Sequence, residues 1–97
     1  MNATTKTKAE KFIAPIQHEL KCNSEMFLCL QKRTKQFEIR KEDDKKFKVG
    51  DHLFFREWFP EEKKYSGDSL KLVITFILRG AQWGIMDGFA ILSTKPY

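Results

Sequence analysis

The sequence predicts an α+β domain that is mainly β. We expect a small, strongly bent sheet or open barrel of about five strands, with one short helix after the first strand. Three observations support this. The chain has 97 residues, enough for one hydrophobic core; several short segments alternate between apolar and polar residues; and only one segment has helical periodicity. A doubly wound sheet is excluded, because it needs several crossover helices.

We predict a flexible leader over residues 1–14 and a single domain over residues 15–97. The first eleven residues are rich in threonine and lysine and show no periodicity. Pro15 prevents a helix from continuing through this point. Apolar and polar residues then alternate from Ile16 to Cys22, which predicts a half-buried strand. Its inward face is expected to carry Ile16, His18, Leu20 and Cys22.

A short helix is predicted directly after this strand. Asn23 and Ser24 are favourable N-cap residues, and Glu25 lies where the helix dipole stabilises a negative charge. The apolar stripe is expected to consist of Met26, Phe27 and Leu30. We expect the helix to end near Lys32 or Arg33, because basic side chains suit a helix C-terminus.

Four further strands are expected, over residues 36–41, 52–59, 70–78 and 89–94. The segment 52–59 is dense in Phe and Trp, which favours a strand covered on both faces. The segment 70–78 alternates most clearly, with one face formed by Leu70, Leu72, Ile74, Phe76 and Leu78. Residues 61–68, including Tyr65-Ser66-Gly67, are predicted as a hairpin loop, and residues 79–87 as a second loop.

The charge of the chain is unevenly distributed. Its formal net charge is +5. Residues 1–48 hold 12 basic and 7 acidic groups, whereas residues 49–97 hold six of each. A one-sided positive field favours polyanions, of which nucleic acid is the commonest in a cell. The alternative is a solvated, lysine-rich surface that keeps a small protein soluble.

Several classes of protein are not expected. No apolar run approaches the ~20 residues needed to cross a bilayer, and no secretory signal is recognisable. We therefore expect a cytoplasmic protein with no membrane partner. Cys22 and Cys29 form no CxxC motif and have no matching His pair, which argues against a metal site. Since there is no glycine-rich phosphate loop, we expect no NTPase activity and no cofactor.

The most informative segment is the predicted junction between the helix and the next strand. Strand geometry places Glu38 and Arg40 side by side on one face, opposite Phe37 and Ile39, and Lys35 enters from the preceding turn. A carboxylate can accept hydrogen bonds from an exocyclic amine, while Arg and Lys donate to carbonyl or phosphate oxygens. The alternative is an ion pair on the surface, worth ~0–1 kcal/mol.

Two residues outside this segment are further candidates for ligand contacts. His18 lies on the apolar face of the first strand, where it is either a hydrogen-bonded, partly buried histidine or a residue of the cleft. Trp83 lies in a predicted loop near Arg79 and Gln82, from which it could stack on a base.

The segment also resembles the signature of the ASCH domains of the PUA-like superfamily, roughly Gly-x-Lys-x-x-Glu-x-Arg after a helix. Lys35, Glu38 and Arg40 match it, and Arg33 stands where the family usually has Gly. The wider order of motifs is similar to that of a small ASCH-related group of uncharacterised bacterial and phage proteins, over about residues 16–94. These motifs include His18-Glu19-Leu20-Lys21, Phe47-x-Val49-Gly50-Asp51 and Gly84…Asp87-Gly88-Phe89.

This resemblance implies a PUA-like open pseudo-barrel with a cleft lined by the Lys-Glu-Arg segment. The superfamily is associated with RNA binding and with modified bases. One branch is similar to small amidohydrolases that deacetylate acetylcytidine with a lysine, a threonine and a glutamate. Lys35 matches that lysine, Glu38 stands at the position of the threonine, and the catalytic glutamate has no match here.

Three functions follow as hypotheses, while the ligand and the oligomeric state are left open. The first is an RNA- or nucleobase-binding module, with Lys35, Glu38, Arg40, Trp83 and His18 as ligand-binding residues. The second is an amidohydrolase acting on a modified nucleoside, with Lys35 and Glu38 as candidate catalytic residues. The third is a non-catalytic protein-interaction domain, in which the polar strand face is plain surface.

Overall fold

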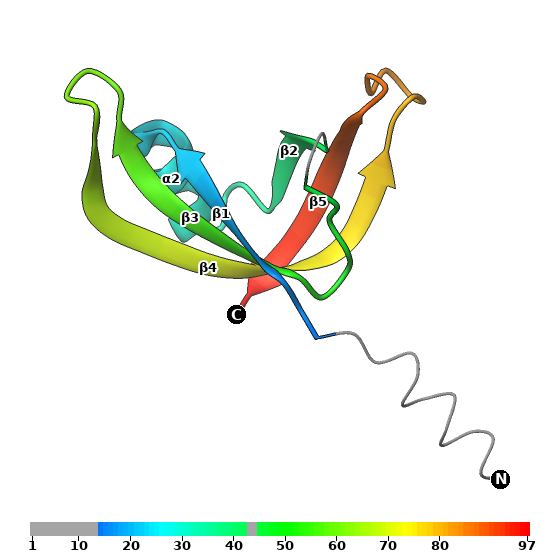
Figure 1. Cartoon of the computed structure of the whole chain (residues 1–97), viewed down its shortest axis with the longest axis horizontal. Coiled ribbons are helices and arrows are strands. Elements are labelled where there is room, and N and C mark those ends of the chain that lie inside the picture. The colour runs from blue at the N-terminus through cyan, green and yellow to red at the C-terminus, as the bar shows by residue number, and fades with distance from the viewer. Residues whose placement is uncertain (1–13, 43–44) are drawn as a thin grey trace, which may run out of the picture.

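A computed structural model describes residues 14–42 and 45–97 of the chain. It contains the elements β1 (Gln17–Cys22), α2 (Ser24–Gln31), β2 (Phe37–Lys41), β3 (His52–Phe59), β4 (Lys64–Arg79) and β5 (Phe89–Pro96). The predicted fold class is confirmed: the protein is mainly β, with a curled five-stranded sheet and one short helix after the first strand (Figure 1). Residues 1–13 of the predicted leader lie outside the described residues.

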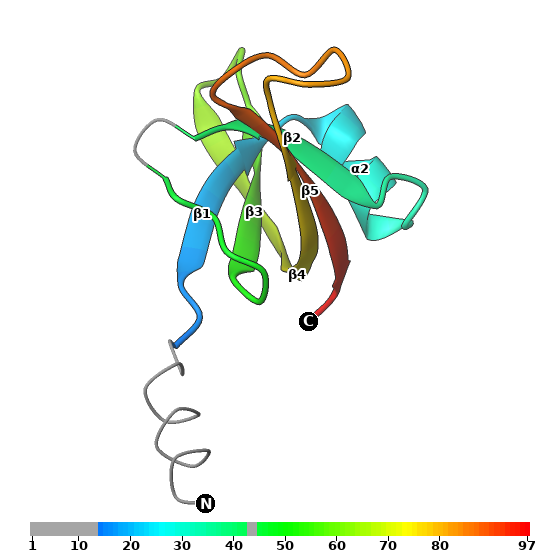
Figure 2. The same cartoon turned by 90° about the vertical axis from the view of Figure 1, so that its right-hand side faces the viewer.

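The five strands form one sheet in the order β1-β3-β4-β5-β2. β1 runs parallel to β3, and the remaining neighbours are antiparallel. The sheet curls strongly, so that its two edge strands approach each other (Figures 1 and 2). At one point a side chain connects these edges, since Nη2 of Arg40 on β2 donates a hydrogen bond to the Lys21 carbonyl of β1, at 3.0 Å. The result is a half-barrel whose seam lies between β1 and β2.

The hydrophobic core fills the concave side of the curled sheet. Alternation along β1 turns His18, Leu20 and Cys22 inward, as predicted. Ile16 precedes the strand and is exposed, so its predicted inward position is wrong. The core comprises Leu20, Cys22, Phe27, Leu30, Phe47, Leu53, Phe55, Leu72, Ile74, Ala90 and Leu92.

The helix covers the concave side because its apolar stripe faces the sheet. Asn23 is its N-cap, and the side-chain oxygen accepts a hydrogen bond from the Met26 N–H at 2.9 Å. Phe27 and Leu30 are buried against the strands, and Lys32 is the C-cap. The predicted position and orientation of the helix are therefore confirmed.

The fourth strand begins earlier than the sequence predicts. Residues 64–68 belong to β4, so the hairpin loop predicted over 61–68 is wrong in its second half. The physical reason is cross-strand packing: Tyr65 lies opposite Trp58, with the two ring centroids 4.8 Å apart and their planes at 70°. A bulge between Arg56 and Trp58 adjusts the register at this point. The connecting turn is therefore confined to residues 60–63.

The alternation predicted for 70–78 holds only as far as Ile74. Ile74 pairs with Thr94 and Phe76 with Ser93, so that Thr75 is one extra residue on β4. This bulge turns Phe76 outward and lets Ile77 pack against the core. The predicted face containing Phe76 and Leu78 is thus wrong beyond the bulge, because period-two alternation cannot anticipate an inserted residue.

The strand β2 has its charged side inside and its apolar side outside. Glu38 is buried, whereas Phe37 and Ile39 are exposed. The register explains this orientation, because Glu38 pairs with Leu92 and Arg40 with Ala90, both of which face the interior. The side of β2 that carries the charges therefore faces the interior of the half-barrel.

Candidate functional site

The structure brings together the three residues of the Lys-Glu-Arg segment. Nζ of Lys35 donates to Oε1 of Glu38 at 2.9 Å, and Nε of Arg40 donates to Oε2 of Glu38 at 2.7 Å. Glu38 is only 5% exposed, while the two cations reach further toward solvent. A buried carboxylate held between two basic side chains is the centre of the candidate site.

Lys35 is positioned by a left-handed turn after the helix. Arg33 adopts a φ of 63°, a conformation that usually favours glycine. Its guanidinium donates to the carbonyl and the hydroxyl oxygens of Thr94 on β5, at 2.7 and 3.3 Å. These hydrogen bonds tie the turn to the sheet. An arginine with its own anchor therefore makes a turn whose backbone usually favours glycine.

The charged cluster opens into a cleft of about 310 Å³, which we call the Glu38 cleft. It is lined by Lys21, Cys22, Asn23, Met26, Glu38, Ile39, Arg40 and Lys41. A second cleft of about 510 Å³, the basic cleft, is lined by Glu19, Leu20, Lys21, Arg40, Lys45, Arg56 and Tyr65. Because Lys21 and Arg40 line both, the two clefts are adjacent and share a basic rim. Volumes in this range suit small ligands.

Aromatic rings lie beneath the cations of this rim. Nζ of Lys21 lies 4.1 Å from the centroid of the Trp58 ring, and the Arg56 guanidinium lies 3.7 Å from that of Tyr65. Arg56 also pairs with Glu19 at 2.7 Å. These contacts order the long basic side chains beside the clefts, and so reduce the entropy that a ligand would have to remove.

Cys22 forms part of the wall of the Glu38 cleft and is a protonated thiol. Burial raises its pKa to about 11, and the negative charge of Glu38 acts in the same direction. A thiol with such a pKa is a poor nucleophile at neutral pH. Cys22 therefore belongs to the apolar lining, and both cysteines are free.

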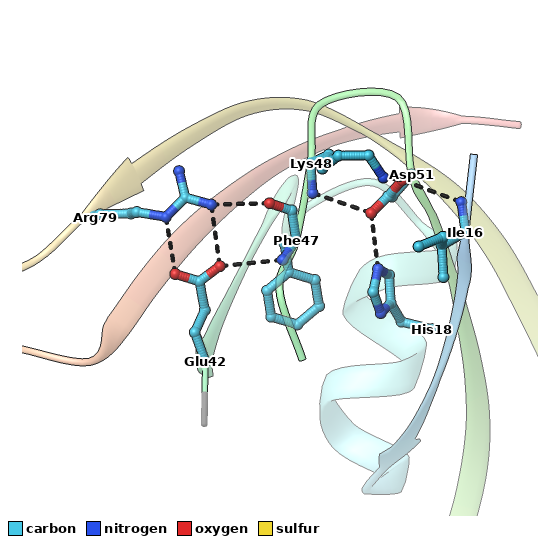
Figure 3. A network of polar contacts seen from close by, with 7 residues as sticks. All are labelled: Ile16, His18, Glu42, Phe47, Lys48, Asp51 and Arg79. Atoms are coloured by element: carbon cyan, nitrogen blue, oxygen red, sulfur yellow. Dashed lines mark hydrogen bonds and ion pairs between the residues drawn. The ribbon is translucent and has the colours of Figure 1, made fainter. Parts of the chain in front are cut away.

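His18 does not line the Glu38 cleft; it belongs to a second polar network (Figure 3). Its Nε2 lies 2.8 Å from Oδ2 of Asp51, and its ring centroid lies 4.7 Å from that of Phe47. Of the two roles considered for this residue, the contacts match the hydrogen-bonded, buried histidine. It connects β1 to the segment that precedes β3.

Asp51 is the centre of this second network and is only 1% exposed. Besides His18, it accepts hydrogen bonds from the backbone N–H groups of Ile16 and Lys48 and from Nζ of Lys48. Burial alone would raise the pKa of Asp51, but these partners outweigh it and lower the pKa to about 2. The carboxylate thus fastens the loop before β3 to the β1 segment.

A third carboxylate, Glu42, was not singled out by the sequence. Arg79 at the end of β4 donates to both of its oxygens, at 2.9 and 3.1 Å, and also to the Phe47 carbonyl at 2.8 Å (Figure 3). Burial would raise the pKa of Glu42, yet the hydrogen bonds from Arg79 and from the Phe47 N–H lower it. Arg79, expected in a contact loop, is thus engaged in fixing the loop before β3. No sequence spacing signals this pairing, because the partners are 37 residues apart.

Trp83 lies in a different cleft from Glu38. It projects from the loop between β4 and β5 and lines a cleft of about 420 Å³, together with Ile39, Gly84, Ile85, Met86, Phe89 and Ile91. This Trp83 cleft is mostly apolar. The structure therefore joins Lys35, Glu38 and Arg40 in one place. His18 and Trp83 do not line the Glu38 cleft, although Ile39 lines both that cleft and the Trp83 cleft.

Two further searches concern the described part of the chain. Within residues 14–42 and 45–97, no group of three or more His, Cys, Asp or Glu side chains is arranged to hold a metal ion. The helix of these same residues is too short to span a membrane.

The fold and the site together define a small, mainly β protein with a curled sheet and a charged cleft at its seam. Comparison with protein families matches residues 17–94 to the family described as a domain of unknown function, DUF3850. The match covers all five strands and the helix, apart from the end of β5, and the chain belongs to this family. A search of curated proteins found no match.

Proposed function

We propose that this protein is a binding module for RNA or for a ligand that contains a nucleobase, and that its fold is of the ASCH type within the PUA-like superfamily. The observation that carries the proposal is the buried Glu38 carboxylate in the wall of the Glu38 cleft, beside the basic rim. A carboxylate that is shielded from water accepts hydrogen bonds from amino groups more strongly than one on the surface. Cytosine, adenine and guanine each offer such an amino group.

The basic rim supports a ligand with a phosphate backbone. Lys21 and Arg40 line both clefts, and Lys45 and Arg56 line the basic cleft. A base in the Glu38 cleft would leave its phosphates beside these side chains, which can neutralise them. Tyr65 in the basic cleft supplies an aromatic ring, as in many sites for single-stranded nucleic acid.

The test is binding of a fluorescein-labelled single-stranded RNA, measured by fluorescence anisotropy over a range of salt concentrations. We expect Lys21→Gln to weaken binding about tenfold and to reduce the slope of log K against log salt by about 0.7, the value for one phosphate contact to a single strand. Lys21 is a suitable position because it does not pair with Glu38, so its replacement leaves the buried cluster intact.

The matched control is Lys95→Gln, which removes the same charge from an exposed position outside both clefts. We expect it to change binding by less than about twofold. Equal effects of the two substitutions, or no saturable binding at low salt, would contradict the proposal.

A separate arm of the experiment addresses catalysis. Acetylcytidine is incubated with the wild-type protein and with Lys35→Ala, and release of acetate is measured. If both proteins release acetate only at the background rate, the binding module remains the proposed function. Turnover that is lost in Lys35→Ala would replace it with the amidohydrolase.

A further inference from the structure

The outward side of β2 carries apolar residues that the core of the protein does not use. Phe37 and Ile39 point away from the half-barrel, on the same side as the exposed Lys41, while Glu38 and Arg40 point inward. Such a strand is the reverse of the usual amphipathic arrangement, in which polar residues face water. The exposed apolar side of β2 therefore needs an explanation outside the folding of the single chain.

The register of the sheet extends this surface across three strands. Phe37 and Phe76 both pair with Ser93, so the two rings flank the same position of β5 on one side of the sheet. In the next row, Ile39 and Leu78 both pair with Ile91. Trp83 and Met86, from the loop between β4 and β5, line the Trp83 cleft together with Ile39 and Ile91. We call this surface the apolar face: Phe37, Ile39, Phe76, Trp83, Met86 and Ile91.

The apolar face is large for a protein of this size. The exposed fractions are 44% for Phe37, 52% for Ile39, 58% for Phe76, 77% for Trp83 and 69% for Met86. Taking about 150–250 Å² for a large side chain, these five residues expose on the order of 450–750 Å². The largest apolar patch of a typical monomer is about 300–600 Å². A standard interface needs about 800 Å² from each partner, and these five residues alone approach that area.

Trp83 is the most exposed residue of this face. Its backbone adopts a left-handed conformation that is unfavourable for a bulky residue. Its φ is 48°, and Gly84 follows with a φ of 80°, in a tight turn bridged by Gln82 and Ile85. Asn, Asp or Gly usually occupy such positions, and a bulky residue there is uncommon. Strain of this kind is retained where the side chain has a function. A projecting ring beside an apolar hollow of about 420 Å³ gives the face both a protrusion and a recess.

We propose that the apolar face binds a second copy of this chain, forming a two-fold symmetric dimer. The six residues that define the face are uncharged, and Lys41 at its border is the one charged residue on the outward side of β2, whereas a nucleic-acid surface needs several basic groups. Homodimer interfaces are more apolar than transient ones, and a two-fold interface pairs each patch with itself. An uncharged face that has its own protrusion and recess meets this requirement. The proposal does not depend on which ligand the Glu38 cleft binds, although Ile39 lines both that cleft and the apolar face.

The test is sedimentation equilibrium of the full chain over a wide range of protein concentration. We expect a reversible monomer–dimer equilibrium, and we expect Trp83→Asn and Ile39→Thr each to raise the dimer dissociation constant at least about tenfold. Asn suits the left-handed turn and Thr suits a strand, so both variants should fold. The control is Leu28→Gln, which removes an exposed apolar side chain from α2 and should change the constant by less than about twofold.

A second measurement needs no substitution. Hydrogen–deuterium exchange of the wild-type protein should show that the β2 amides become more protected as the concentration rises, while those of α2 do not. A chain that remains monomeric at all concentrations would overturn the proposal, and so would a dimer that is weakened by Leu28→Gln and not by Trp83→Asn. If the monomeric chain instead loses RNA affinity on Trp83→Asn, the face belongs to the nucleic acid.

Discussion

Two buried carboxylates, Glu38 and Asp51, are each held by two basic side chains, yet they differ in what else surrounds them. Asp51 also accepts hydrogen bonds from two backbone N–H groups and is almost completely shielded. Glu38 is held by side chains alone and lies in the wall of a cleft. Backbone donors cannot leave without unfolding the loop, whereas a lysine or an arginine can rotate toward a ligand. The comparison teaches that a carboxylate bound by backbone N–H groups is structural, whereas one bound by side chains alone can exchange its partners.

The largest expected effect is on stability at Asp51. We expect Asp51→Ala to lower the free energy of unfolding by about 3–5 kcal/mol, because it leaves buried donors without an acceptor. Urea denaturation followed by circular dichroism measures this loss. Asp51→Asn provides a second variant that preserves the shape of the side chain. A loss below about 1 kcal/mol in both would remove the distinction between the two carboxylates.

The second expected effect is a decrease in the free energy of unfolding at low pH. The pKa of Asp51 is about 2 in the folded protein, below its ordinary value of 3.8. The ionised form is therefore favoured by folding, and this contribution is complete above pH 4 and lost as the pH falls toward 2. It amounts to about 2 kcal/mol.

The pH effect is measured as the difference in unfolding free energy between the wild type and Asp51→Asn, at pH 6 and at pH 2.5. Glu42 also has a lowered pKa, but it is present in both proteins and cancels. A difference that stays constant between the two pH values would contradict the assignment.

The smallest expected effect is on stability at Glu38. Glu38→Gln should lower the free energy of unfolding by only about 1 kcal/mol, because Lys35 and Arg40 can turn toward water when the carboxylate is neutralised. The same denaturation experiment checks this value. A loss as large as that of Asp51→Ala would make Glu38 a structural residue and weaken its assignment to a ligand site.

Much of the fold could be predicted because its signals are local. The N-cap at Asn23 and the alternation of β1 depend on neighbours in the sequence, and both were found from it. The contact between Lys35, Glu38 and Arg40 was also accessible, since all three lie within six residues. What failed depends on how the strands pair and curl in three dimensions. The extension of β4 rests on the pairing of Tyr65 with Trp58 across a bulge, and the separation of Trp83 from Glu38 rests on how the sheet curls.

The orientation of β2 illustrates the same limit. Its alternating pattern showed correctly that Glu38 and Arg40 share a side. Which side faces the interior is decided by the pairing with Leu92 and Ala90 of β5, at least fifty residues away in the sequence. The alternating pattern alone would favour Phe37 and Ile39 as the interior side, and the pairing with β5 overrides it.

The bulge at Thr75 has a consequence for how inside and outside are assigned along β4. The segment 72–78 is apolar at every position except Thr75, so either phase of the strand would present hydrocarbon to the interior. In a regular strand without the bulge, Phe76 and Leu78 would face the interior and Ile77 would face solvent. This one extra residue therefore determines which side chains of β4 face the interior. Moving the bulge along the strand would exchange buried for exposed positions without any substitution.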